Sequence, residues 1–231
     1  MKLVGDLYAY VWDGQDNNCN TYVFARCLKD NRHLVVDPGH VVTPYLREPA
    51  LDRLVEAMKE DGLDVSDSGL VIATHGHTDH CEAADAIRQR NGASSESSGQ
   101  VLVALHKADE QLYRRCGERV DIYLEEGDLE LGKESKLNLK VYHSPGHSPG
   151  HITIYWPAEK VLIAGDVIFH RATGRVDLPG GSVRQLKQSI DRLSELDIEY
   201  VLCGHPYGHP GIIKGKGAVR QNFDFIRMNM F

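Results

Sequence analysis

Short apolar runs alternate along the chain with segments in which apolar residues recur every three or four positions. The short runs, rich in β-branched residues, predict buried strands, and they cover residues 3–12, 22–27, 34–39, 69–74, 101–105, 139–142, 152–156, 161–166 and 200–204. The segments of helical composition or periodicity lie at 46–60, 81–88, 107–116, 182–196 and 218–231. Strands and helices that follow one another in this way predict an α/β fold.

Two polar stretches interrupt this pattern without dividing the chain. Residues 91–100 are rich in Gly and Ser and predict a surface loop rather than a domain boundary. Residues 127–133 match the spacing of a phosphate-binding loop, but Glu134 stands where Ser or Thr is required, and Asp128 and Glu130 would repel a phosphate. A turn between short strands is the better interpretation. We therefore expect one domain over residues 1–231.

The composition excludes several classes of partner. The 231 residues are 42% hydrophobic, with a net charge of −7 and a pI near 5.9. This charge argues against binding to nucleic acid or to an anionic membrane, and no apolar run approaches the ~20 residues that a membrane helix needs. The first residues, Met1–Asp6, predict a strand rather than a signal peptide. Five cysteines without a Cys-x-x-Cys pair favour a reducing, cytoplasmic location.

The polar residues with the clearest chemistry directly follow the predicted strand at 69–74. The run is His75-Gly-His77-Thr-Asp79-His80, and a segment of helix-forming residues comes after it. Imidazole nitrogens and carboxylate oxygens are ligands for zinc, iron and manganese. His75 and His77 are two positions apart and can bind one ion from a loop. Asp79 and His80 face another direction at the start of a helix, where they can serve a second ion.

Three further candidates stand at or just beyond the ends of other predicted strands. His147 follows the strand at 139–142, Asp166 closes the strand at 161–166, and His205 follows the strand at 200–204. Open α/β sheets carry their functional groups at such strand ends. One histidine or aspartate there is commonly a cap, whereas four strand ends that each carry a metal-type ligand predict a shared metal site.

These motifs resemble those of the metallo-β-lactamase superfamily. The matching parts are the His-x-His-x-Asp-His run at 75–80, Pro-Gly-His at 145–147, Ala-Gly-Asp at 164–166 and Gly-His-Pro at 204–206. Segments 144–151 and 175–182 look most like the small glyoxalase II-type hydrolases of that superfamily. The resemblance implies a four-layer αββα sandwich with the metals at one edge of two central sheets. It also implies that the turn at 13–18 faces the metals and helps to shape the substrate site.

The resemblance further implies two divalent ions, with zinc as the first expectation and iron or manganese as alternatives. It assigns His75, His77 and His147 to one ion, Asp79, His80 and His205 to the other, and Asp166 to both. Asp79 and Asp166 are then the expected catalytic carboxylates. A metal-activated hydroxide would attack a thioester such as S-lactoylglutathione.

Other residues are expected around the metals. Arg175 and Tyr207 match places where glyoxalase II-like enzymes contact glutathione, and His170 lies where substrate can reach it. Fewer than thirty residues follow His205, too few for the extra helical segment of larger relatives, so a basic group is the alternative binder of the thiol. This group is Lys214, Lys216 and Arg220. Expected supporting residues are Thr74, Thr78, Asp177 and Asp37, the last as a brace and not a ligand. His143 and His151 are expected to face solvent or support the ligands, and His33, His40, His106 and His209 to have no role in the site.

Other functions remain open, among them a metal-binding protein without catalytic activity, although an open site without a substrate would be unusual. A persulfide dioxygenase with one iron is the main alternative, because such relatives bind Fe(II) at positions like His75, His147 and Asp166. The complete second ligand set favours two metals and therefore hydrolysis. A β-lactamase is the weaker alternative, because such enzymes are normally exported and no leader is predicted.

Overall fold

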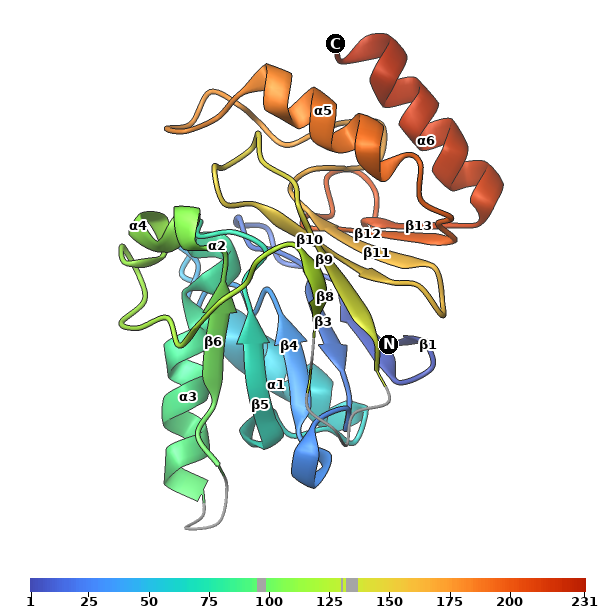
Figure 1. Cartoon of the computed structure of the whole chain (residues 1–231). Helices are drawn as coiled ribbons and strands as arrows, with labels where there is room; N and C mark the ends of the chain where they lie inside the picture. The colour runs from blue at the N-terminus through green and yellow to red at the C-terminus, as the bar shows by residue number, and fades with distance from the viewer. Residues whose placement is uncertain (95–98, 130, 132–136) are drawn as a thin grey trace.

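The computed structural model of the protein describes residues 1–94, 99–129, 131 and 137–231. Within these residues, two β-sheets lie face to face (Figure 1). The first sheet has the order β1 (Lys2–Val4), β2 (Leu7–Tyr10), β3 (Thr21–Phe24), β4 (His33–Val36), β5 (Ser68–Ile72), β6 (Leu102–Leu105) and β7 (Ile122–Tyr123). The second has the order β13 (Ile212–Lys214), β12 (Tyr200–Cys203), β11 (Val161–Gly165), β10 (Ile152–Trp156), β9 (Leu139–His143) and β8 (Gly127–Leu129).

Helices cover the outer face of each sheet, which produces four layers (Figure 1). The described helices are α1 (Ala50–Glu60), α2 (Thr78–Cys81), α3 (Ala83–Ser94), α4 (Glu110–Tyr113), α5 (Val183–Leu193) and α6 (Lys216–Asn229), with short 3-10 turns η1 (Lys29–Asn31), η2 (Val65–Asp67) and η3 (Lys107–Asp109). No described helix is long and apolar enough to cross a membrane. The predicted αββα sandwich is confirmed.

Three apolar clusters separate the four layers. The first packs α1 and α3 against the first sheet, the second lies between the two sheets, and the third packs α5 and α6 against the second sheet. Strand β3 shows why: Tyr22 and Phe24 belong to the cluster between the sheets, while Val23 faces α1 and α3. Because both faces of such a strand are buried, its sequence is a continuous apolar run rather than an alternating one.

The strand predictions need corrections at the start of the chain and at the sheet edges. The predicted strand at 3–12 is two strands, β1 and β2, because Gly5 turns the chain with a φ of 54°. Strands β7 and β13 were not predicted, since each has only two or three residues at or near a sheet edge. Residues 127–129 of the rejected phosphate loop form strand β8, whereas 130, 132 and 133 lie outside the described residues.

Several predicted helix boundaries were also wrong. Helix α1 begins at Ala50 and not at 46, because the backbone N–H groups of Tyr45 and Leu46 donate to Asp16 instead of entering a helix. The helix predicted at 81–88 begins earlier, as α2, and continues as α3 to Ser94. Residues 91–94 of the predicted loop at 91–100 are therefore helical, and 95–98 lie outside the described residues. The helix predicted at 107–116 is η3 followed by α4. Helix α6 spans 216–229 rather than 218–231.

Parallel pairing brings the strand ends with functional residues to one edge. Strands β4, β5, β6 and β7 are parallel in the first sheet, as are β11 and β12 in the second. The two sheets are joined at this edge by backbone hydrogen bonds, from Ile152 N to Thr74 O at 2.8 Å and from Asn20 N to Gly204 O at 2.7 Å. The loops that follow β5, β9, β11 and β12 therefore meet across the seam between the sheets.

Candidate metal centre

All seven predicted ligands lie together at this seam. They come from the loop and helix after β5, the loop between β9 and β10, and the ends of β11 and β12. Among the described residues, three groups have ligand atoms within 4.8 Å of one another: His75, His77 and His147; His75, His80 and Asp166; and Asp79, His80 and His205. The groups overlap, so they form one continuous cluster. We call the first of them the three-histidine group and the last the mixed group.

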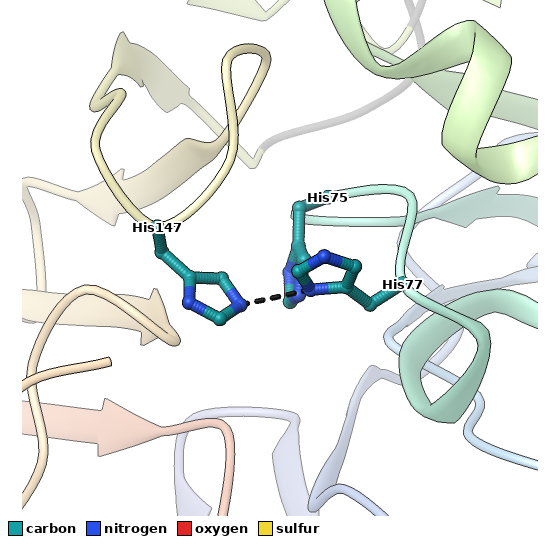
Figure 2. Close-up of side chains that lie close together, drawn as sticks. All are labelled: His75, His77 and His147. Carbon is teal, nitrogen blue, oxygen red and sulfur yellow. Dashed lines mark hydrogen bonds between the residues drawn. The ribbon is translucent and has the colours of Figure 1, made fainter. Parts of the chain in front are cut away.

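The rings of the three-histidine group converge on one point (Figure 2). The Nδ1 atom of His77 lies 2.9 Å from Nε2 of His147. The Nε2 atom of His75 is buried and has no hydrogen-bond partner among the described residues. On the far side, His75 Nδ1 lies 3.1 Å from the Thr74 hydroxyl, and His147 Nδ1 donates to the carbonyl oxygen of Arg175 at 2.7 Å. Each of these two rings is thus anchored through one nitrogen and presents the other to a cation.

The mixed group repeats this arrangement. The Nε2 atoms of His80 and His205 are 3.2 Å apart. Their other nitrogens point outward, where His80 Nδ1 donates to Asp37 Oδ2 at 3.0 Å and His205 Nδ1 to the carbonyl oxygen of Asn18 at 2.9 Å. Two facing imidazole nitrogens, with the Asp79 Oδ2 atom 3.4 Å from His205 Nε2, form a donor set that fits a metal ion.

The Asp166 carboxylate lies between the two groups. Its Oδ2 atom is 3.4 Å from His147 Nε2 and 3.6 Å from His205 Nε2, and its Oδ1 atom is 3.3 Å from His80 Nε2. Oδ1 is buried and makes no hydrogen bond to a described residue. A buried carboxylate oxygen in that condition is costly unless a cation accompanies it. The residues present therefore fit divalent metal ions.

Burial and charge affect the two groups differently. Burial and the neighbouring imidazoles lower the pKa of His75 well below its usual value, and they lower that of His77 to about 4. Both rings are neutral at pH 7, which is the form that binds metals. Burial also opposes the charged form of His205, but Asp166 and Asp79 outweigh it and raise the pKa of that ring to about 9. The carboxylates thus attract positive charge to the mixed group.

Two further residues brace the ligands from behind. Asp37 accepts from Thr74 N at 2.7 Å and from the Thr74 hydroxyl at 2.8 Å, besides holding His80. His151 is buried, stacks on His75 with ring centroids 4.8 Å apart, and accepts from Asp166 N at 3.1 Å. The structure thus places Asp37, Thr74 and His151 in contact with the candidate ligands. His143 instead stacks on His106 and contacts the Pro149 carbonyl.

Asp109, a buried residue at the end of η3, was not predicted to support the site. Its Oδ2 atom accepts from Gly76 N at 3.0 Å and from the Ser148 hydroxyl at 2.6 Å, and its Oδ1 atom accepts from Gly150 N at 2.6 Å. Gly76 lies between His75 and His77 in the sequence, and Ser148 and Gly150 follow His147. One carboxylate therefore joins the two loops that form the three-histidine group. The residues around Asp109 in the sequence do not predict this role, because all its hydrogen-bond partners are more than thirty positions away.

A pocket of about 730 Å³ opens in front of the candidate metal ligands. It is lined by Asn17, His40, Pro44, Tyr45, His77, Thr78, Asp79, His147, Asp166, Phe169, Ala172, Thr173, Arg175, Leu178, His205 and Tyr207. Asn17 brings the turn at 13–18 to the pocket, as the resemblance implied, and donates to Asp79 Oδ2 at 2.6 Å. His40, for which no role was predicted, also lines the pocket and pairs with Glu82 at 2.6 Å.

The predicted substrate residues are placed differently from one another. Arg175 and Tyr207 line the pocket. The Arg175 side chain is already paired, because its Nε and Nη2 atoms donate to the two carboxylate oxygens of Asp177, each at 2.7 Å. Tyr207 stacks on His205 with ring centroids 4.8 Å apart. His170 is exposed, stacks on His209 and is not among the lining residues. The basic group is also outside the lining: Lys216 pairs with Asp197, Arg220 with Asp224, and Lys214 lies over Tyr200.

Comparison with known proteins identifies the family of the chain. A family model described as the metallo-beta-lactamase superfamily matches residues 14–205. The chain is 31% identical over 180 residues to hydroxyacylglutathione hydrolase GloC of Haemophilus influenzae, covering 74% of this chain and 78% of that protein.

Two solved structures illustrate the range of its structural neighbours. BLEG-1 B3 metallo-beta-lactamase superposes with a TM-score of 0.71 at 26% identity, over 95% of this chain and 99% of that one. TTHA1623 in a di-iron-bound form gives a TM-score of 0.69 at 26% identity, over 93% and 98%. The family match spans residues 14–18 of the turn and every candidate ligand from His75 to His205. The chain belongs to the metallo-β-lactamase superfamily.

Proposed function

We propose that the protein is a hydrolase that holds two divalent metal ions, with zinc as the first expectation and iron or manganese as alternatives. The observation that carries this proposal is the position of Asp166 between the three-histidine group and the mixed group. Its two oxygens lie 3.4 Å from His147 Nε2 and 3.3 Å from His80 Nε2. A carboxylate that faces two sets of nitrogen donors is suited to bridge two ions.

The metals and the protein have separate parts in the reaction. Two ions bound at this site supply a water whose pKa is lowered to about 7 and a Lewis acid for the attacked carbonyl group. The chain positions the ligands through their outward hydrogen bonds, and Asn17 fixes the Asp79 carboxylate. The open pocket in front of Asp79, Asp166 and His205 leaves space for the substrate beside them.

The substrate that we propose is a thioester such as S-lactoylglutathione. The motif resemblance and the similarity to GloC, a hydroxyacylglutathione hydrolase, support this class. So does Arg175, a cation at the pocket that is suited to a substrate carboxylate. Because Arg175 is already paired with Asp177, a bound carboxylate would share or replace that partner.

Substitution of Arg175 tests this substrate assignment. Arg175 holds His147 through its backbone carbonyl and not through its side chain, so Arg175→Ala removes the guanidinium and keeps that hydrogen bond. For a glutathione thioester we expect kcat/KM to fall on the order of tenfold, mainly through KM. A neutral thioester should lose little. The control is Arg220→Ala, which removes an exposed cation outside the pocket; equal losses on both substrates for Arg175→Ala would contradict a carboxylate-binding role.

An assay panel separates hydrolysis from the alternatives. Metal-loaded protein is offered S-lactoylglutathione, glutathione persulfide with oxygen uptake recorded, and a β-lactam. We expect cleavage of the thioester to be the fastest reaction by far. Rapid oxygen uptake by iron-loaded protein without thioester cleavage would show a persulfide dioxygenase instead, and preferred cleavage of the β-lactam would show a lactamase.

A further inference from the structure

Two cysteines lie side by side directly behind the mixed group. Cys81 is the last residue of α2 and immediately follows His80, and its Sγ atom is 3.4 Å from Sγ of Cys116. Cys116 belongs to the turn that follows α4, 35 residues further along the chain. All five cysteines of the chain are free thiols in this structure. The metal site described above makes no use of this sulfur pair.

Formation of a disulfide between Cys81 and Cys116 would break only weak interactions of the two thiols. A disulfide has a sulfur–sulfur distance of about 2.05 Å, and these two sulfurs are already in contact with each other. Each sulfur also hydrogen-bonds to a backbone carbonyl, Cys81 Sγ to His77 O at 3.2 Å and Cys116 Sγ to Tyr113 O at 3.4 Å, and the Thr78 side chain is a further hydrogen-bond partner of Cys116. Thiols are weak donors, so oxidation gives up only weak hydrogen bonds.

Exposure gives the two sulfurs different parts in the reaction. Cys81 is fully buried, whereas Cys116 is half-buried in a surface turn. A small oxidant such as hydrogen peroxide therefore reaches Cys116 first. A peroxide-reactive thiol with a second thiol in contact is the arrangement of a cysteine and its resolving partner.

We propose that Cys81 and Cys116 are an oxidative modification site, which closes to a disulfide with peroxide and loosens metal binding at the mixed group. In the first step the Cys116 sulfur attacks a peroxide oxygen, an S–O bond forms, the O–O bond breaks and one water leaves. The Cys81 thiol then attacks the resulting sulfenic sulfur, the S–S bond forms, the S–O bond breaks, and the departing hydroxide takes the Cys81 proton and leaves as a second water. In total two thiols lose two electrons and two protons, and one peroxide is reduced to two waters.

The predicted effect on metal binding follows from the position of Cys81. Helix α2 is four residues long and contains both Asp79 and His80. Closing the sulfur pair requires an approach of over ~1 Å, whereas a metal site tolerates displacements of only about 0.5 Å. The Cys116 turn cannot absorb the whole movement freely, because Cys116 N donates to Tyr113 O and Glu118 N donates to Asp85 Oδ2. This second part rests on the ligand assignment in the proposed function, and the disulfide itself does not.

Peptide mapping tests the modification site. Metal-loaded protein is treated with hydrogen peroxide, and its peptides are analysed without reduction. We expect a Cys81–Cys116 linkage, a mass loss of two hydrogen atoms, and a fall from five titratable thiols to three, which is five minus the two linked. Cys116→Ser should abolish the linkage, whereas Cys27→Ser, which alters the other half-buried cysteine, should retain it. A linkage between other cysteines, or stable sulfinic acid at Cys116 without a linkage, would overturn the proposal.

Chelator competition tests the coupling to the metals. In the oxidised protein the affinity for the more weakly held ion should fall by about tenfold or more, and a thiol reductant should restore it. Cys116→Ser treated in the same way should keep its affinity. A complete disulfide with unchanged metal affinity would overturn the coupling. Failure of the ligand assignment is distinguishable, because the reduced protein would then not bind two ions at the outset.

Discussion

At the scale of single residues, the candidate ligands depend on their outward hydrogen bonds. His75, His80, His147 and His205 each hold one ring nitrogen against Thr74, Asp37, the Arg175 carbonyl or the Asn18 carbonyl. This anchoring fixes which nitrogen of each ring faces the other candidate ligands. The residues that anchor the rings should therefore affect metal affinity, although none of them contacts the metal.

Asp109 supports the ligands in another way, because it holds the two loops that carry the three-histidine group rather than a ring nitrogen. Asp109→Asn keeps the size of the side chain but turns an amide N–H₂ toward one of the donors from Gly76, Ser148 or Gly150. An unsatisfied buried donor costs about 1–3 kcal/mol, and we expect the affinity of the three-histidine group for metal to fall by about tenfold or more. Metal titration of the purified variant measures this loss.

Asp85→Asn is the matched control. Asp85 is also a buried carboxylate, but it binds Arg88, Tyr113 and Glu118 N rather than the ligand loops. Both variants should lower the unfolding temperature, and only Asp109→Asn should change metal affinity. If the two variants bound metal equally well, Asp109 would be a residue of general stability only.

Gly204 shows how closely the backbone approaches the bridging carboxylate. A Cβ atom at this position would lie 2.2 Å from Asp166 Oδ1 and 3.0 Å from the carbonyl carbon of Gly165. Gly204→Ala must therefore displace Asp166, and we expect the metal content and the activity to be lost. Gly217→Ala on α6 meets nothing within 4 Å and should leave both unchanged. Full metal content in purified Gly204→Ala would contradict the central position of Asp166.

The candidate ligands could be proposed from the sequence, whereas the residues that support them could not. His75, His77, Asp79 and His80 form a local motif, and His147, Asp166 and His205 each follow an apolar run, so their strand-end placement was predictable. Asp109 and His40 are distant in the sequence from the site residues that they lie beside, and only the folded chain brings them there. No short-range pattern marks a carboxylate whose partners lie more than thirty positions away.

At the scale of elements, the central strands were predicted well and the short or capped ones were not. Strands β5, β11 and β12 are buried on both faces, so their apolar runs stand out. Strands β7 and β13 are short, and their existence depends on pairing with a neighbour. The start of α1 depends on a tertiary contact with Asp16, which helical periodicity cannot reveal.

Asp16 accepts from the backbone N–H groups of Asn17 and Tyr45, which line the pocket, and its ionisation leads to a prediction about pH. Burial opposes its charged form, but backbone N–H groups, foremost that of Leu46, and the Thr43 hydroxyl lower its pKa from 3.8 to about 2. Because the pKa is lower in the folded protein, the ionised group stabilises the fold above about pH 4, and this contribution is lost as the pH falls toward 2.

We therefore expect Asp16→Asn to lower the free energy of unfolding at pH 7, with the difference from the unsubstituted protein shrinking below pH 4. Denaturant unfolding at a series of pH values measures that difference. Asp13→Asn, in the same turn but exposed, is the control and should have little effect. A difference that stayed constant down to pH 2 would exclude an ionised Asp16 as its source.

At the scale of the whole molecule, the seam between two sheets creates the candidate site. The first sheet contributes His75, His77, Asp79 and His80, and the second contributes His147, Asp166 and His205. Neither half of the chain holds a complete ligand set, since the three-histidine group and the mixed group each draw on both sheets. Metal binding is therefore expected to stabilise the packing of the sheets against each other.

The number of metal ions bound at saturation tests the central claim most directly. Protein purified without added metal is stripped, titrated with zinc, and analysed for bound metal after removal of the excess. The position of Asp166 between two groups of donors predicts two ions per chain. Saturation at one ion, with no second ion bound when iron or manganese replaces zinc, would contradict it.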